Sequence, residues 1–263
     1  MTHLRAIVRI LSLLVLTVAS YAAIRGGIVL RRLEGDARLR YFIERYQRWC
    51  RRVSRLMGMR IRRVGPVPEA PYLLVSNHVS YTDILALGVL VAPVFVAKAE
   101  IARWPFLGVL VRDAGAVFID RVRVKHIPSV IEEVERRFES GFGMALFPEG
   151  TTSDGRQVAA FRPSLLEVAV RSGRGVTPAA LLYRTPPGCR PAGEAVAWVG
   201  TATLVPHLYG LLRLPWFEVL VTFSGKELRG EDRKHLAETA RVEVARLLEA
   251  GRSAAGTGGE AGT

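Results

Sequence analysis

After Gly65, the chain alternates short apolar runs with longer stretches in which apolar residues recur every three or four positions. The short runs predict strands, and they are Leu73–Val75, Val94–Ala97, Ala116–Ile119, Met144–Phe147, Val176–Tyr183, a run near Ala195–Val199, and Trp216–Phe223. The helical stretches between and after them are Asp83–Val91, Val122–Phe138, Leu165–Val170 and Glu231–Ala250. Because parallel strands need a crossover that is usually helical, this order predicts an α/β domain with a mixed, largely parallel sheet flanked by helices.

The N-terminal segment has a different pattern. From Ile7 to Leu30 the chain is mostly apolar, and its uninterrupted part, Ile10 to Ile24, is 15 residues long. A free-standing membrane span needs roughly 20 apolar residues, but arginines at its ends, here Arg9 and Arg25, can reach the interface. A cleaved signal peptide is the alternative, because a basic, an apolar and a small-residue stretch follow one another. An arginine-rich flank resists translocation, so we expect an uncleaved anchor or a deeply interfacial helix, with the rest of the chain on the cytoplasmic side.

That flank is itself patterned. Between Arg31 and Arg63 there are twelve arginines and three acidic residues. Apolar side chains recur there at helical spacing, at Leu39, Phe42, Ile43, Tyr46, Trp49, Val53 and Leu56. The helix could lie on a membrane surface with anionic lipids, or it could pack its apolar stripe on its own domain and leave the arginines in solvent. Both placements can hold at once.

Composition narrows the class of protein. With 263 residues, 49% of them hydrophobic, the chain can bury a full core, so wholesale disorder is excluded. A net charge of +13 indicates polyanionic partners, namely nucleic acid, anionic lipid headgroups or phosphorylated substrates. Only Cys50 and Cys189 are present, which excludes a disulfide framework. We expect a membrane-associating helical segment over residues 1–64, a catalytic domain over 65–250 and a disordered tail over 251–263.

One histidine stands out chemically. His78 follows the predicted strand Leu73–Val75, and Asp83 comes five positions later. A carboxylate bonded to one ring nitrogen fixes the tautomer and leaves the other nitrogen free to take a proton. Alternatively, Asp83 caps the following helix, because Ser80-x-x-Asp83 resembles a capping box, and spacing does not separate the two roles.

No protein nucleophile accompanies this pair. The elbow G-x-S-x-G of lipid esterases is absent, so a base at His78 would act on a hydroxyl of a substrate. A metal site is not expected, because His78 and Asp83 offer two ligands without an obvious third.

Other predicted strands also end in polar residues. Phe147–Ser153 is a glycine- and hydroxyl-rich loop suited to an oxyanion or a polyol, although an ordinary turn explains it equally well. Ala116–Ile119 is followed by Asp120 and Arg121, and arginine suits a phosphate, unless the two residues simply pair with each other. Lys98 closes Val94–Ala97 in the same way.

Together these segments resemble the four ordered sequence blocks of the glycerolipid acyltransferases, in particular the bacterial 1-acyl-glycerol-3-phosphate acyltransferases. The blocks are Asn77-His78-x-x-x-x-Asp83, Phe118-Ile119-Asp120-Arg121, Phe147-Pro148-Glu149-Gly150-Thr151 and Thr177-Pro178-Ala179. The resemblance covers roughly Leu73 to Tyr183, and the fourth block departs from the family's pattern at Thr177.

The resemblance implies a mechanism and a set of ligands. His78 would deprotonate the acceptor hydroxyl, which attacks an acyl thioester, and Asp83 would orient the ring. Acyl-CoA or acyl carrier protein would be the cosubstrate, with no metal or redox cofactor. The residues that would bind substrate are Asn77, Lys98, Arg121 for the phosphate, Glu149 and Gly150 for the glycerol part, and Thr151.

The expected protein is therefore a membrane-bound O-acyltransferase on the cytoplasmic side of the cell inner membrane that converts 1-acyl-glycerol-3-phosphate to phosphatidic acid. Its partners would be a lysophospholipid acceptor and anionic membrane lipids, not nucleic acid. The continuation Ser153–Arg156 and Phe161–Ser164 also resembles acyltransferases that complete ornithine lipids, so a lyso-ornithine lipid is the alternative acceptor. A non-catalytic basic membrane-binding protein is the alternative of another class, and it leaves His78, Asp83 and Glu149 unexplained.

Overall fold

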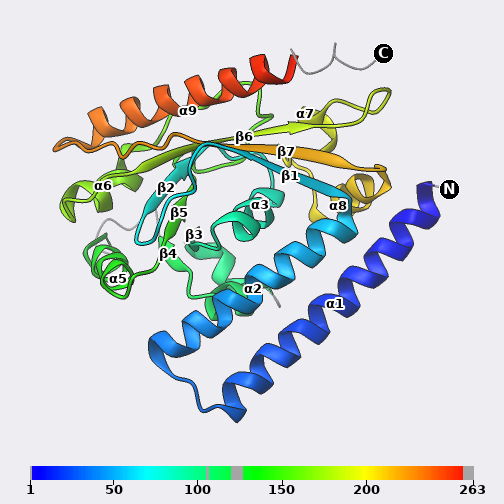
Figure 1. Cartoon of the computed structure of the whole chain (residues 1–263), viewed down its shortest axis with the longest axis horizontal. Helices are drawn as coiled ribbons and strands as arrows, with labels where there is room; N and C mark the ends of the chain where they lie inside the picture. Colours follow the sequence, from blue (N-terminus) through cyan, green and yellow to red (C-terminus); the bar gives the residue numbers. More distant parts are fainter. Residues whose placement is uncertain (1, 105–106, 120–126, 257–263) are drawn as a thin grey trace.

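The computed structural model describes residues 2–104, 107–119 and 127–256 of the chain. Its strands form one sheet in the order β1-β7-β6-β2-β5-β3-β4 (Figure 1). The strands are β1 Met59–Val64, β2 Leu73–Ser76, β3 Val94–Lys98, β4 Val117–Ile119, β5 Met144–Leu146, β6 Thr177–Arg184 and β7 Phe217–Phe223. Neighbouring strands run parallel except β6 and β7, which are antiparallel. The predicted mixed, largely parallel sheet is confirmed.

Helices cover both faces of this sheet. They are α1 Thr2–Leu30, α2 Gly35–Met57, α3 Thr82–Leu90, the 3₁₀ helix η1 Ala99–Arg103, α4 Leu107–Asp113, α5 Ile127–Glu139, α6 Pro163–Arg171, α7 Ala192–Ala195, α8 Leu204–Arg213 and α9 Arg233–Gly256. Successive side chains of a strand point to opposite faces. In β2, Leu73 and Val75 pack in a core with α5, α6 and α9, whereas Leu74 packs in a second core with α2, α3 and α8. Burial on both faces explains why β2 is a continuous apolar run.

Some predicted elements differ from the structure. The expected strand near Ala195–Val199 is instead α7 followed by an irregular segment, in which Val196 and Ala197 are buried without strand pairing. Strand β1 was not predicted, because its exposed arginines hide the pattern of a strand that pairs only with β7 at the edge of the sheet. The sheet therefore begins inside the segment assigned to the N-terminal region. Helices α4 and α8 were also missed.

The last helix continues past the expected end of the domain. Helix α9 runs to Gly256, so the prediction of disorder from residue 251 is wrong for residues 251–256. The reason is tertiary packing, since Gly251 is buried close to Leu182 and Leu220 of the sheet. Arg252 then donates hydrogen bonds to the carbonyl oxygens of Gly155 and Arg156. Residues 257–263 lie outside the described part of the chain.

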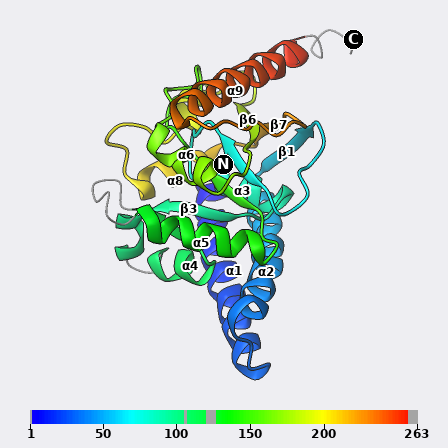
Figure 2. The same ribbon diagram turned by 90° about the vertical axis from the view of Figure 1, so that its left-hand side faces the viewer.

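The two N-terminal helices lie side by side along the domain (Figures 1 and 2). Helix α1 is long and apolar enough to cross a membrane, and most of its surface is exposed. It is nevertheless tied to the domain at both ends. Arg9 donates to the carbonyl oxygens of Leu212 and Leu214 at the end of α8, while Tyr21 and Arg25 bond to Asp113 at the end of α4. Helix α2 packs its predicted apolar stripe on the domain.

Candidate active site

Three of the predicted site segments lie at one edge of the sheet. Strands β2, β3, β4 and β5 are parallel neighbours in the sheet, so their carboxyl ends meet there. Asn77 and His78 follow β2, Lys98 closes β3, and Glu149 comes shortly after β5. The fourth segment follows β4 in sequence, but Arg121 lies outside the described residues, and its phosphate contact stays a prediction.

The turn that follows β2 is held in place by Asn77, which is fully buried. Its side-chain amide donates to the Leu181 carbonyl oxygen over 3.0 Å, and its carbonyl accepts from the Leu181 amide over 2.8 Å. This pairing joins the end of β2 to β6, where the ladder between the two strands stops. Because its polar atoms are engaged and shielded from solvent, we assign Asn77 to positioning of His78, not to the substrate contact expected from the sequence.

His78 and Asp83 form the predicted pair. The distance from His78 Nδ1 to Asp83 Oδ2 is 2.7 Å. Asp83 is completely buried, while the His78 side chain is 19% exposed. The imidazole stacks on Phe147 with ring centroids 4.0 Å apart and planes 13° apart. Its other nitrogen, Nε2, makes no hydrogen bond to the described residues. The ring is thus fixed in orientation with one basic nitrogen left for an external proton donor.

Asp83 makes the contacts expected for both of its predicted roles. Besides the imidazole, its Oδ2 accepts hydrogen bonds from the amides of Val79, at 2.7 Å, and Ser80, at 3.0 Å. In a complete capping box the Ser80 hydroxyl would also accept the Asp83 amide. Here that amide donates to the Ser80 carbonyl oxygen instead, and the buried Ser80 hydroxyl has no partner among the described residues, so only half of the box is formed. The same carboxylate closes the turn and orients the histidine.

Glu149 connects the third sequence block to the first. Its Oε1 accepts the His78 amide over 3.1 Å, and the Ser153 amide donates to the His78 carbonyl oxygen over 2.8 Å. Glu149 is 3% exposed, and its Oε2 is buried without a hydrogen bond of normal geometry to the described residues. Burial, with a smaller contribution from the charge of Asp83, raises the pKa of Glu149 to about 7, although the His78 amide opposes this.

The remaining predicted residues lie at the rim of this edge or in its turns. Gly150 has φ of +77°, a backbone conformation that favours glycine, and its amide bonds to the Phe147 carbonyl oxygen. Thr151 is exposed. Lys98 is half exposed and forms a surface ion pair with Glu100 at 3.4 Å. Contacts of these residues with a substrate remain predictions. Within residues 2–104, 107–119 and 127–256, no cluster of three or more His, Cys, Asp or Glu side chains could hold a metal ion.

The protonation of Glu149 predicts a pH-dependent stability. A carboxyl pKa raised from 4.5 to about 7 means that ionisation at neutral pH destabilises the fold. The neutral carboxyl of Glu149 therefore stabilises the fold relative to the ionised one. Its contribution to the free energy of unfolding is complete below pH 4.5 and is lost as the pH rises through 7. At about 1.4 kcal/mol for each pH unit, the loss is about 3 kcal/mol. Glu149→Gln stays neutral, so its stability relative to the wild type should rise by about this amount between pH 4.5 and pH 8.5.

Denaturant unfolding of the two proteins in the same detergent, at several pH values, measures this difference. A difference that stays constant across the pH range would contradict the raised pKa.

Three residues of the site were not found from the sequence. The Tyr183 hydroxyl donates to Asp83 Oδ1 over 2.6 Å and accepts from the Thr82 hydroxyl over 3.0 Å, all within the buried core. Trp198 donates its amide to the Val79 carbonyl oxygen. His207 accepts from the Tyr81 hydroxyl at Nδ1 and donates from Nε2 to the Ala197 carbonyl oxygen. Since burial lowers the pKa of His207, its ring is neutral near pH 7 and suited to this structural role.

Tyr183→Phe is expected to lower kcat by several-fold while changing KM little. Asp83 would keep its other donors but lose the one on Oδ1, so the carboxylate could shift relative to the imidazole. The loss of one hydrogen bond to a charged group should also lower stability by roughly 1.5–3 kcal/mol. Steady-state kinetics and a thermal melt of the same preparation check both. Tyr209→Phe, which removes an exposed hydroxyl bonded to His3, serves as the control.

Comparison with known proteins bears on the family to which the chain belongs. The model of the Acyltransferase family matches residues 58–182. The lyso-ornithine lipid O-acyltransferase of Brucella abortus is 37% identical over 210 residues, which are 75% of this chain and 79% of that protein. The enzyme of the same name from Rhizobium meliloti is 36% identical, over 81% of this chain and 74% of its own length.

Other relatives carry a different name. The 1-acyl-sn-glycerol-3-phosphate acyltransferase of Neisseria meningitidis is 34% identical over 60% of this chain and 62% of its own length. The crystal structure of the 1-acyl-sn-glycerophosphate acyltransferase of Thermotoga maritima superposes with a TM-score of 0.65 at 21% identity, covering 93% of this chain and 98% of that one. The latter supports the fold. From the family match and the extent of the Brucella alignment, the chain belongs to the acyltransferase family.

Proposed function

We propose that this protein is a membrane-bound O-acyltransferase that transfers an acyl group from a thioester to the hydroxyl of a lysolipid, with His78 as the general base. The observation that carries the proposal is the His78–Asp83 pair, in which a buried carboxylate orients the ring and Nε2 has no partner among the described residues. Membership of the acyltransferase family supports acyl transfer as the reaction in which this pair would act.

The reaction follows from this arrangement in two proton transfers. His78 Nε2 takes the proton of the acceptor hydroxyl as the oxygen attacks the thioester carbonyl, and the buried charge of Asp83 stabilises the imidazolium. The tetrahedral intermediate then expels the thiolate, which receives the proton from His78. An ester bond has formed and a thioester bond has broken. The thioester is acyl-CoA or acyl carrier protein, and no metal or redox cofactor takes part in these steps.

For the acceptor we propose a lyso-ornithine lipid ahead of 1-acyl-glycerol-3-phosphate. The two relatives that align with 75% and 81% of this chain are named for the first acceptor, whereas the Neisseria relative, named for the second, aligns with 60%. This order reverses the preference drawn from the sequence alone. Arg121 would then meet a carboxylate or its own neighbours instead of a phosphate.

The reaction would take place at the cytoplasmic face of the cell inner membrane. Both acceptor and product reside in a bilayer, and α1 offers it an exposed apolar surface. The excess of arginine in α2 and β1 favours the cytoplasmic side.

A panel of acceptors tests the proposal. Purified protein is incubated with labelled acyl thioester and either lyso-ornithine lipid, 1-acyl-glycerol-3-phosphate or other lysolipids, and products are identified by mass. We expect diacylated ornithine lipid as the main product. Phosphatidic acid as the main product would restore the order of acceptors expected from the sequence. The absence of acylated lysolipid with every acceptor would contradict the proposed function.

A further inference from the structure

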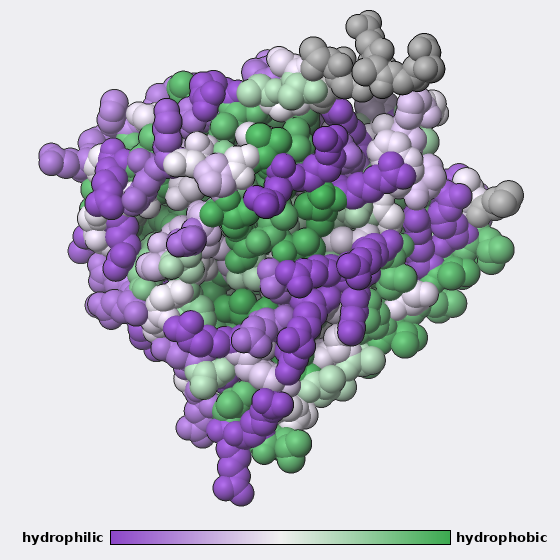
Figure 3. All heavy atoms as spheres, in the orientation of Figure 1, coloured by the Kyte–Doolittle hydropathy of each residue, from purple (hydrophilic) through white to green (hydrophobic). Residues whose placement is uncertain are grey.

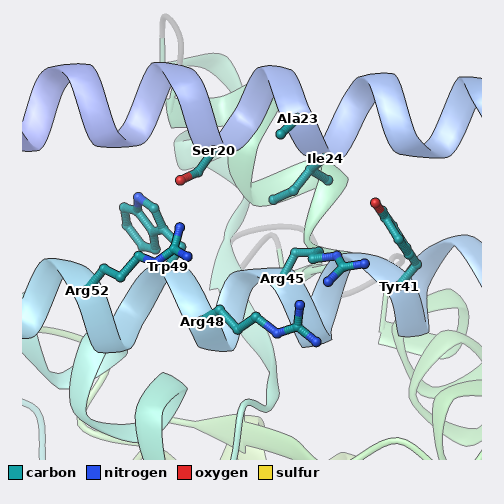
Figure 4. Close-up of a pocket in the computed structure, with 8 residues that line it drawn as sticks. All are labelled: Ser20, Ala23, Ile24, Tyr41, Arg45, Arg48, Trp49 and Arg52. Atoms are coloured by element: carbon teal, nitrogen blue, oxygen red, sulfur yellow. The ribbon is translucent and has the colours of Figure 1, made fainter.

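A cavity of about 290 Å³ lies between the two N-terminal helices, and His78 is not among its lining residues. Helix α1 lines it with Ser20, Ala23 and Ile24, while α2 contributes a basic and aromatic side (Figure 4). The residues of that side are Tyr41, Arg45, Arg48, Trp49 and Arg52. The cavity is about the size of the smallest ligand sites, roughly 300 Å³.

Contacts between α1 and α2 lie on both sides of this cavity along the helix axes. The Trp49 indole donates to the Thr17 hydroxyl over 3.2 Å. Toward the other end of α1, the Tyr41 ring packs so closely against Gly27 that a Cβ there would collide with it. The cavity is therefore a gap between two points of contact that hold the helices in place.

Three arginines that line the cavity have no acidic partner within the described part of the chain. Arg45, Arg48 and Arg52 form no ion pair with the described residues, although Arg45 lies over the Tyr41 ring at 4.7 Å. Elsewhere in the N-terminal region, Arg25 and Arg38 both pair with Asp113. Three uncompensated guanidinium groups in one cavity create a site for a group with negative charge, and guanidinium forks match phosphate oxygens well.

The position of the cavity indicates which phosphate it would receive. The apolar side chains exposed on α1 recur at helical spacing and form a stripe on its surface, at Leu4, Ile7, Val8, Leu11, Leu14, Val15 and Val18. Figure 3 shows this hydrophobic edge beside hydrophilic side chains over α2. The axes of two packed helices lie about 8–10 Å apart. This separation is similar to the depth of roughly 5–10 Å to which an interfacial helix enters a bilayer. With α1 among acyl chains, the arginines of α2 lie at the depth of the headgroups.

We propose that this cavity binds the headgroup of an anionic phospholipid, with Arg45, Arg48 and Arg52 contacting the phosphate and the acyl chains running along α1. Trp49 suits the same depth, since tryptophan favours the membrane interface. Such a bound lipid is distinct from the acyl acceptor. It would fix the two helices, and with them the domain, relative to the bilayer.

Native mass spectrometry of the full-length protein in a neutral detergent tests the site, with no acyl donor present, so the result does not depend on turnover. The probes are phosphatidylglycerol, phosphatidylcholine with the same chains, and inorganic phosphate. We expect one phosphatidylglycerol to be retained, with the other two binding roughly tenfold more weakly. The triple variant Arg45→Gln, Arg48→Gln, Arg52→Gln should weaken phosphatidylglycerol binding by roughly tenfold or more.

The matched control is Arg51→Gln, Arg62→Gln, Arg63→Gln, which removes the same charge from exposed arginines that do not line the cavity. It should change binding by less than about twofold. Equal losses in both triple variants would show diffuse attraction and overturn the proposal, as would equal binding of phosphatidylcholine or inorganic phosphate. If the first variant does not fold, Ser20→Phe fills the cavity without a change of charge. Undiminished binding in that variant would also overturn the proposal.

Discussion

His78→Ala is expected to lower kcat for acyl transfer by about 10²–10⁴-fold, the range of general-base catalysis. The substitution removes His78 Nε2, which has no partner among the described residues, and Asp83 cannot replace it, because that carboxylate is buried and occupied by donors. The turn itself should survive, since the amides of Val79 and Ser80 still bond to Asp83. Initial rates with a lysolipid acceptor measure the effect.

Two controls separate chemistry from folding. His235→Ala removes an exposed histidine of α9 and should leave kcat unchanged. Because His78→Ala also removes a hydrogen bond to the buried Asp83 carboxylate, its free energy of unfolding should fall by roughly 1.5–3 kcal/mol, and a cooperative thermal melt above the assay temperature shows that it is folded. A folded His78→Ala protein with more than about a tenth of wild-type turnover would contradict the role of general base.

Asp83→Asn is the second large effect expected. The amide has nearly the same shape, and its oxygen can still accept the three N–H groups that now meet at Oδ2. What disappears is the negative charge 2.7 Å from the imidazole, which stabilises the imidazolium formed during the reaction. We expect kcat to fall by about 10²–10⁴-fold, with KM for the acceptor nearly unchanged. Loss of charge-assisted hydrogen bonds should cost about 1–3 kcal/mol of stability.

Asp232→Asn is a matched control for the structural part of this change. Asp232 also accepts two backbone amides, those of Lys234 and His235 at the start of α9, but it is exposed and has no histidine ring bonded to it. It should retain wild-type kcat. If Asp83→Asn also retained wild-type kcat, Asp83 would act as a helix cap alone.

Much of the fold follows from local patterns in the sequence. Each of the apolar runs that became β2 to β7 is a short apolar segment, so its type and order could be predicted. Strand β1 could not, because Arg60, Arg62 and Arg63 give it the pattern of a polar segment and only its pairing with β7 makes it a strand. Val196 and Ala197 show the opposite case, in which burial comes from packing against neighbouring elements without strand pairing.

The candidate site also contains contacts that the sequence could predict and contacts that it could not. His78 and Asp83 are five residues apart, so local spacing was enough to predict their contact. Tyr183 is 100 residues from Asp83, and only the register of β2 against β6 brings it to that carboxylate. For the same reason the sequence could not show that the Asn77 amide is used by the backbone of Leu181.

The central claim is that His78 activates a lysolipid hydroxyl for attack on a thioester. The most direct test is a single-turnover reaction of purified wild-type and His78→Ala protein with labelled acyl thioester, with and without a lysolipid. The account predicts that the wild type forms acylated lysolipid and releases no free fatty acid when the acceptor is absent, and that the folded variant forms neither product. Release of free fatty acid by the wild type in the absence of acceptor, or undiminished acyl transfer by the folded variant, would contradict this role of His78.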